Sequence, residues 1–205
     1  MLNAVGREIP QEVLDETGKT VFQGTYQFDQ HEYTKAPVKA RTRIGGSGSK
    51  LESSIQEVLQ KCNVHDGMTI SFHHHFREGD LVVMQVMNVI HELGYKDITI
   101  CASSLSKAQD DLVPMIEDGT VTHIETSGVR GKLGEAISEG KLKGIAILRS
   151  HGGRVRAIET GETKIDIAFI GAPSCDEYGN CRGVGGNSNC GVLSYAAIDA
   201  EYAEN

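Results

Sequence analysis

The chain has 205 residues, of which 39% are hydrophobic, so it is long enough and apolar enough to bury one large core. Its formal net charge of −8 excludes a broad basic surface for a phosphate backbone, and we expect no nucleic acid among its partners. The five cysteines lack Cys-x-x-Cys spacing, and no apolar run approaches the about 20 residues that a membrane span needs. We therefore expect a cytoplasmic protein with reduced thiols that does not bind a membrane.

The first 43 residues show no clear hydrophobic periodicity and contain several residues that interrupt regular structure, namely Pro10, Gly18, Gly24 and Pro37. We interpret 1–43 as an N-terminal extension that either wraps around the domain or contacts a partner. The domain itself is expected over 44–205.

The domain begins with a helix signal. In Ser49-Lys-Leu-Glu52 the serine and the glutamate have the spacing of a capping box, in which two side chains satisfy unpaired N–H groups at a helix start. Apolar residues then recur at helical spacing, so the pattern predicts a helix over about 51–62.

From there, short apolar runs alternate with helical patterns. Strands are predicted at 68–72, 98–102, 121–124, 144–148 and 165–170. Helices are predicted between them at 80–93, 109–117, 132–139 and 154–160. This alternation indicates an α/β fold, with a mostly parallel sheet flanked by helices on both faces.

The end of the chain, 194–205, has a helical pattern with no strand after it. In a parallel sheet, a crossover helix is normally followed by a strand that pairs beside the previous one. Two interpretations stay open: a terminal helix docked on the sheet, or a gene product that continues past Asn205, with 44–205 as the first of two domains.

In open α/β sheets, ligands bind at the carboxyl ends of the strands, so the loops at that edge are the candidate site. The first loop, His73-His-His-Phe-Arg-Glu-Gly-Asp80, offers His73, His75 and Arg77 to a carboxylate. A zinc site completed by His151, Cys175 or Asp176 is the alternative, but no metal-ligand spacing accompanies these histidines, so we predict no metal. A purely structural role in the loop is the third possibility.

The second loop follows the strand predicted at 144–148. It contains Ser150, His151, Gly152, Gly153 and Arg154. Two glycines permit close approach of the backbone to a ligand, and an imidazole beside an arginine suits an anion or a thioester oxygen. The alternative is an ordinary strand–helix turn with solvated arginines.

The third cluster contains Ser174 and Asp176, followed by the glycine-rich stretch 183–191 with Asn187 and Ser188. Small donors in such a stretch can cradle an oxyanion, or form only a flexible loop. Asp176 either takes part in proton transfer or caps the turn of a β-hairpin at Tyr178-Gly-Asn180.

Several motifs together resemble the CoA-transferases, namely Asp66-Gly-Met-Thr-Ile-Ser-Phe72, Gly94-Tyr-Lys-Asp-Ile-Thr99, Lys132-Leu-Gly-Glu-Ala-Ile-Ser-Glu-Gly140 and Asp176-Glu-Tyr-Gly-Asn180. The His73–Asp80 loop and the Ser150–Arg154 loop are similar to those of citrate lyase α subunits within that family. The resemblance runs from about Gly45 to Asn205.

The resemblance implies the NagB/RpiA/CoA-transferase fold and an acyl transferase. Family members exchange the thiol arm of an acyl carrier protein between acetate and citrate, and a β subunit then cleaves the citryl carrier to oxaloacetate. The resemblance also implies an oligomeric complex whose partners are the β subunit, the carrier (γ) subunit, citrate and acetate. No cofactor is expected on this chain, since the thioester stays on the prosthetic group of the carrier.

Many relatives carry a catalytic Glu in a Glu-Asn-Gly signature. This signature is absent here, so the catalytic residue is unknown and the chain alone is expected to be a poor transferase. A CoA-transferase for another small acid and a non-catalytic ligand-binding or assembly module are the alternatives.

Overall fold

A computed structural model describes residues 1–24, 34–39, 48–73 and 79–205. The chain forms two compact units, Met1–Thr34 and Lys35–Asn205. The first unit contains an antiparallel bridge between Leu2 and Glu8 and the helix α1 (Gln11–Thr17). The boundary predicted after residue 43 lies in 40–47, outside the described residues.

The second unit is built on a five-stranded sheet in the order β4-β3-β2-β1-β5, in which every neighbouring pair is parallel. This confirms the predicted α/β class and the predicted strands. Their bounds are β1 (Thr69–His73), β2 (Ile98–Ala102), β3 (Val121–Thr126), β4 (Ala146–Leu148) and β5 (Ile167–Ile170). The short strands β6 (Ser174–Cys175) and β7 (Cys181–Arg182) pair antiparallel, as the hairpin interpretation of this segment required.

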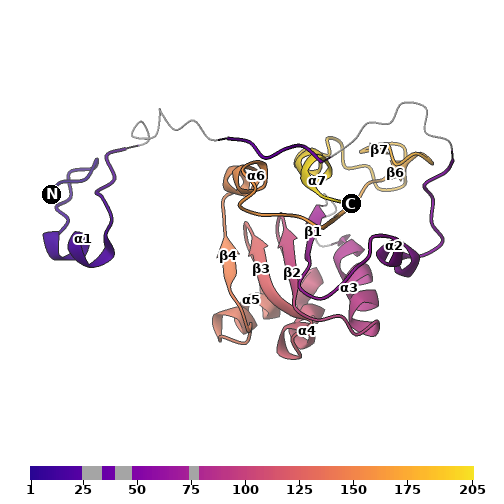
Figure 1. Cartoon of the computed structure of the whole chain (residues 1–205), viewed down its shortest axis with the longest axis horizontal. Coiled ribbons are helices and arrows are strands. Elements are labelled where there is room, and N and C mark those ends of the chain that lie inside the picture. Colours follow the sequence, from indigo (N-terminus) through magenta and orange to yellow (C-terminus); the bar gives the residue numbers. More distant parts are fainter. Residues whose placement is uncertain (25–33, 40–47, 74–78) are drawn as a thin grey trace. The chain divides into compact units, whose positions relative to one another are not determined.

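Helices connect the strands and flank the sheet (Figure 1). They are α2 (Ile55–Lys61), α3 (Val82–Glu92), the 3₁₀ helix η3 (Lys107–Leu112), α4 (Val113–Glu117), α5 (Gly131–Ser138), α6 (His151–Glu159) and α7 (Ala196–Tyr202). None of the helices in the described ranges is long and apolar enough to cross a membrane.

The predicted start of the first domain helix is wrong. α2 begins at Ile55, where the Ser54 hydroxyl accepts a hydrogen bond from the Glu57 N–H at 3.2 Å. The Glu57 carboxylate in turn accepts from the Ser53 hydroxyl at 2.6 Å. The Ser54 hydroxyl thus satisfies an N–H group of the first turn, whereas the Ser49 hydroxyl only accepts from Leu51 N–H at 3.1 Å. Two successive serine–glutamate spacings, 49–52 and 54–57, therefore made the sequence signal ambiguous.

A second boundary also differs from the prediction. The helix expected at 154–160 begins at His151, because Ser150 acts as its N-cap and accepts a hydrogen bond from Gly153 N–H at 3.0 Å. The two glycines therefore lie in the first helical turn and not in a preceding loop.

One face of the sheet forms the main hydrophobic core. Alternate strand residues such as Ile70, Phe72 and Ile100 point to this face and are buried. They pack against the apolar side of α3, η3, α4 and α5. Full burial of side chains of this size contributes about 1.5–3 kcal/mol each. This face therefore supplies most of the apolar burial in the domain.

The opposite face carries polar side chains, among them Ser71, Thr99 and Glu125, and is covered in part by α6 and α7. Among the described residues, a small apolar cluster forms here, from Ile158, Ile165 and Ala203. In Figure 1 the strand arrowheads point toward α6, so the carboxyl ends of the strands lie on the side of α6 and α7.

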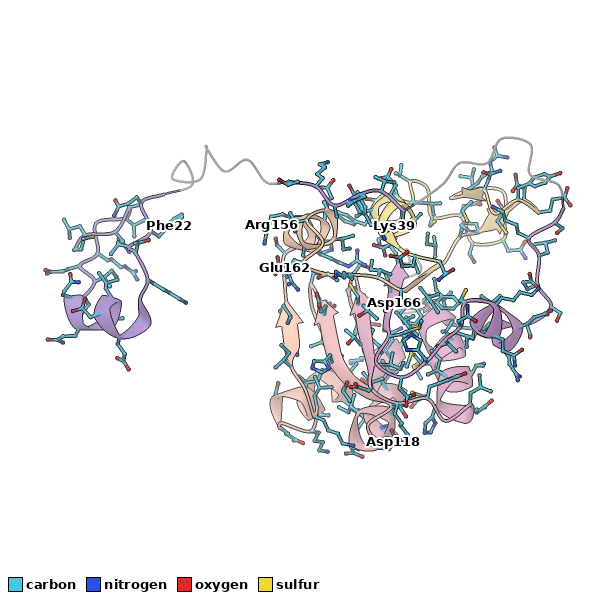
Figure 2. All side chains as sticks on the ribbon, in the orientation of Figure 1. Phe22, Lys39, Asp118, Arg156, Glu162 and Asp166 are labelled. Carbon is cyan, nitrogen blue, oxygen red and sulfur yellow. The ribbon has the colours of Figure 1, made fainter. Side chains whose placement is uncertain are left out.

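A short extended segment, 34–39, binds these two helices together. The Ala36 N–H donates to the carbonyl of Glu159 at the end of α6, at 2.6 Å, and the Lys39 N–H donates to the carbonyl of Glu201 in α7, at 2.7 Å. Lys39, which lies beside α7 in Figure 2, also pairs with Glu204 at 2.6 Å. The segment is a strap across two elements that are distant from it in sequence.

Candidate functional site

The strand order identifies the edge where a ligand is expected. From β1 the chain proceeds through β2 and β3 to β4, and then crosses back to place β5 on the other side of β1. In open α/β sheets, ligands bind outside the carboxyl ends of the strands at such a reversal. His73, the last residue of β1, pairs with Ile170 and is 3% exposed. The candidate site therefore lies around the end of β1.

Tyr195, just before α7, connects the first two predicted loops. Its ring centroid is 5.9 Å from that of His73 and 5.4 Å from that of His151, both within the usual range for ring contacts. His73 ends β1 and His151 opens α6, which follows β4 at the far edge of the sheet. The structure thus places two histidines that are remote in sequence against the same tyrosine ring.

The first turn of α6 offers hydrogen-bond donors next to these rings. Helix N-termini have unpaired N–H groups and a positive partial charge, so they favour anions. His151 and Gly152 are exposed at this end, and a Cβ added to Gly152 would meet no atom within 4 Å. At Gly153 an added Cβ would lie 3.1 Å from the Ser150 hydroxyl, which is closer than most real contacts. Gly152 leaves space for a ligand, and Gly153 leaves space for the cap.

The Arg154 side chain forms an ion pair inside the protein. Its two terminal nitrogens donate to the Asp199 carboxylate at 2.8 and 2.9 Å, and one also donates to the Ser71 hydroxyl at 3.0 Å. The Ser71 hydroxyl donates to the same carboxylate at 2.5 Å. Burial alone would lower the pKa of Arg154, but the Asp199 carboxylate raises it above its usual value.

This pair lies inside the protein, since Arg154 is 5% exposed and Asp199 is fully buried. We had predicted that Arg154 or Arg77 supplies the charge for a bound anion. The Arg154 charge is already compensated by Asp199, so this geometry gives no support to that role for Arg154. Arg77 and His75 lie in 74–78, outside the described residues.

Cys101 lies under the same ion pair, in β2. Burial raises the pKa of its thiol to about 11, so it stays protonated at neutral pH and is not a nucleophile. None of the five cysteines forms a disulfide in the described parts of the chain.

The third predicted cluster belongs to the β6–β7 hairpin. The Asp176 carboxylate accepts hydrogen bonds from the N–H groups of Tyr178 and Asn180, both at 2.9 Å, and from the Asn180 side chain at 2.7 Å. These bonds, first of all those from Asn180, hold the pKa of Asp176 below its usual value. An ionised turn-capping carboxylate matches the second of our two interpretations, and proton transfer has no support here.

The glycine-rich stretch uses several of its donors internally. The N–H groups of Cys190 and Gly191 both donate to the Gly183 carbonyl at 2.9 Å, and the Ser174 hydroxyl donates to the Val184 carbonyl at 2.7 Å. Asn187 and Ser188 are exposed. Among residues 79–205, no hydrogen bond joins Ser174 or Asp176 to His151 or Arg154.

A cavity of about 300 Å³ lies elsewhere, on the polar face of the sheet. Its lining includes Thr69, Thr99 and Glu125, and none of the predicted site residues. The Glu125 carboxylate is engaged by Arg149 and Thr163, both at 2.6 Å. We favour the carboxyl edge of the sheet as the site, because ligands of open α/β sheets bind there and none of the predicted site residues lines this cavity.

Sequence reasoning missed three residues of the site region, Ser71, Tyr195 and Asp199. Ser71 lies inside an apolar run, where a single serine gives little signal. Asp199 lies in Ala196-Ala-Ile-Asp-Ala200, and an acid surrounded by small apolar residues was the one available hint of a buried partner for an arginine.

Comparison with known proteins identifies the family. Residues 48–205 match the family described as citrate lyase, alpha subunit. The chain is 45% identical over 179 residues to the citrate lyase alpha chain of Haemophilus influenzae, covering 87% of this chain and 36% of the relative. It is 48% identical over 166 residues to that of Escherichia coli, covering 81% of this chain and 31% of the relative. The chain thus spans about a third of the length of these curated relatives.

A solved structure gives the same result. The structure of a citrate lyase alpha subunit from Streptococcus mutans, in complex with citrate, aligns with a TM-score of 0.80 and 45% identity. The alignment covers 99% of this chain and 39% of that one. The chain belongs to the citrate lyase alpha subunit family.

Proposed function

We propose that this chain carries the citrate-binding part of a citrate lyase alpha subunit, which transfers the thiol arm of an acyl carrier protein from acetate to citrate. Membership of the family supports this, and so does the relative from Streptococcus mutans, which is described in complex with citrate. The reaction breaks the thioester to acetate and forms the thioester to citrate, and no electrons are gained or lost.

The full assignment extends beyond this chain. The proposed partners are the beta subunit, which cleaves the citryl carrier to oxaloacetate, and the carrier (gamma) subunit, in an oligomeric complex in the cytoplasm. The thioester stays on the prosthetic group of the carrier, so the proposal requires no cofactor on this chain. Because the chain spans about a third of its relatives, we propose the complete activity for a full-length alpha subunit and not for these 205 residues alone.

The main support for the proposal is that the Tyr195 ring contacts the rings of both His73 and His151 beside the first turn of α6. A carboxylate that leaves water must recover its hydrogen bonds from the protein. Imidazole N–H groups and helix N–H groups can supply them, and the positive end of the α6 dipole adds a favourable potential. The same donors would stabilise negative charge on a thioester oxygen during acyl transfer.

The test is a calorimetric titration of the purified chain with citrate, in the parent and in His151→Ala. A hydrogen bond to a charged ligand contributes about 1.5–3 kcal/mol, so the variant is expected to bind citrate about 10-fold to 100-fold more weakly. His151 is exposed, so its removal should leave the thermal stability nearly unchanged.

His91→Ala is the matched control. His91 is also partly exposed, but it pairs with Asp118 at 2.8 Å, and Figure 2 shows Asp118 at the end of the domain opposite α6. This variant should bind citrate like the parent. Equal citrate affinity in the parent and both variants would contradict the proposed site, and a preference for acetate over citrate would favour a transferase for another acid.

A further inference from the structure

Two cysteines face each other across the β6–β7 hairpin. Cys175 in β6 is the direct cross-strand partner of Cys181 in β7, and both residues are exposed. Directly opposite residues of an antiparallel pair project their side chains to the same side, with Cβ atoms about 4.5–5.5 Å apart. The two thiol groups therefore share one exposed side of the hairpin.

The hydrogen bonds of the hairpin show which kind of cross-strand pair this is. The Asp176 N–H donates to the Asn180 carbonyl at 3.2 Å, so these two residues bond to each other across the strands. Because the two kinds of pair alternate along an antiparallel ladder, Cys175 and Cys181 form a non-hydrogen-bonded pair, in which the Cα atoms are typically about 4.5 Å apart. A disulfide requires a Cα separation of about 4.4–6.8 Å. The backbone is therefore already within the range of a disulfide.

The turn between the two cysteines is held by its own hydrogen bonds. The Gly179 N–H donates to the Asp176 carbonyl at 3.1 Å, and Gly179 has a φ of 86°, which a glycine adopts without strain. The Asp176 carboxylate accepts further hydrogen bonds from Tyr178 and Asn180. These bonds fix the register of the two strands, so the cysteines are aligned before any reaction begins.

We propose that Cys175 and Cys181 form a site of reversible oxidation, at which a small-molecule disulfide is exchanged for a cross-strand disulfide. One cysteine thiolate attacks the small-molecule disulfide and releases one thiol, which leaves a mixed disulfide on the protein. The second cysteine then attacks the protein sulfur of that mixed disulfide and releases the other thiol. The protein thiols lose two protons and two electrons in total, and the small-molecule disulfide takes them up as it is reduced to two thiols.

Other roles for the pair find less support. Among the residues that the structure describes, no group of three histidine, cysteine or acidic side chains is placed to hold a metal ion. Burial raises the pKa of Cys181, and negative charge on Cys175 and Asp176 acts in the same direction, so this thiol is not an activated nucleophile at neutral pH. Disulfide exchange requires neither a metal nor an activated nucleophile, because the second thiol attacks from within the same hairpin.

The proposed disulfide is expected to be easily reduced. It would close only the short loop 176–180, and a short loop removes little entropy from the unfolded chain, so the gain in stability is small. Exposed disulfides also have higher reduction potentials than buried structural ones. In a reducing compartment the pair would stay reduced, and it would form the disulfide only when small-molecule disulfides accumulate.

The experiment incubates the reduced chain with mixtures of oxidised and reduced glutathione and measures its intact mass. Every sample carries Cys62→Ala and Cys190→Ala, because these half-buried thiols could also react, whereas Cys101 is buried. This background chain should lose two hydrogen atoms and retain no glutathione. Cys175→Ser and Cys181→Ser should each retain one glutathione, since the mixed disulfide then has no second thiol to attack it.

A register control keeps two exposed thiols on the hairpin. In the double variant Cys181→Ser, Arg182→Cys, the second thiol moves to the neighbouring position, whose side chain points to the opposite face. The equilibrium constant for disulfide formation should be at least about 10-fold lower in this variant than in the background chain. Equal constants in the two chains, or glutathione retained on both thiols of the background chain, would overturn the proposal. Citrate enters neither measurement, so the result does not depend on the proposed function.

Discussion

The two faces of the sheet differ in polarity. On one face, Ile70, Phe72 and Ile100 pack against helices in a continuous apolar core. On the other, the alternate residue Ser71 contacts the buried ion pair of Arg154 and Asp199. Both sets come from the same strands, because side chains of a strand alternate between faces. The apolar face holds the fold together, and the polar face determines how α6 and α7 are placed.

This difference explains how β4 and β1 can share a site although β3 and β2 separate them. Apolar contacts are not directional, so an apolar surface between α6 and the sheet would fix the helix position only by shape. The two-pronged pair between Arg154 and Asp199 fixes α6 against α7 at one position. Tyr195 and His151 lie one turn from these partners, so the same contact positions the site.

The largest expected effect tests the polar face. Asp199→Ala would leave the buried Arg154 charge without a counter-ion and should lower the free energy of unfolding by about 3–5 kcal/mol. Urea unfolding followed by circular dichroism measures this loss. The double variant Arg154→Met, Asp199→Leu removes both charges and should recover most of the stability, while citrate affinity stays low because α6 is no longer fixed. A loss below about 1 kcal/mol in Asp199→Ala would mean that the pair is solvated.

A somewhat smaller effect is expected on the apolar face. Ile100 is fully buried in the core, and Ile100→Ala should cost about 3 kcal/mol, the transfer term plus the cavity that remains. Its side chain points away from α6 and α7, so citrate affinity of the folded variant should stay within about twofold of the parent. A larger change in affinity would show that the two faces are not separable.

The smallest effect concerns a surface network at the other end of the domain. The Asp118 carboxylate accepts hydrogen bonds from Lys96 at 2.9 Å, from His91 at 2.8 Å and from the Thr120 N–H at 2.8 Å. Desolvation acts to raise the pKa of Asp118, but these bonds, first that from Lys96, hold it well below its usual value. The stabilisation is therefore present above about pH 4 and is lost as the pH falls below the pKa of the unfolded state, because only the unfolded state then takes up the proton.

Asp118→Asn should lower the melting temperature at pH 7 by about 1–3 °C, as expected for a partly exposed network. The difference from the parent should shrink on going to pH 3. A difference that grows toward low pH would reverse the sign of the proposed effect. Compared with the pair on the polar face, this network shows how little the same charges contribute when water solvates them.

The fold was predictable from the sequence because its strands are short apolar runs separated by helical patterns. The runs ending at Phe72 and Ala102 match β1 and β2 within one residue. The helix starts were less predictable, since Ser49 and Ser54 both stand three residues before a glutamate and the structure uses Ser54 as the cap.

The candidate site was predictable in part. Parallel strands end at one edge, so His73 and His151 could be assigned to a shared site without coordinates. Tyr195 and Asp199 could not, because their role depends on how α7 lies across the sheet. An acid in a short helix usually faces water, and no local pattern distinguishes one that lies under an arginine.

The strap at 34–39 has a consequence for the order of folding. Lys35 pairs with Glu159, 124 residues away in sequence, and Lys39 N–H bonds to the carbonyl of Glu201, near the other end of the chain. Contacts of such separation close large loops and form late. During synthesis the strap is made first but has no partner until α6 and α7 have left the ribosome. A chain with the sheet formed and the strap unbound is therefore the expected last intermediate, with the ends of α6 and α7 still exposed.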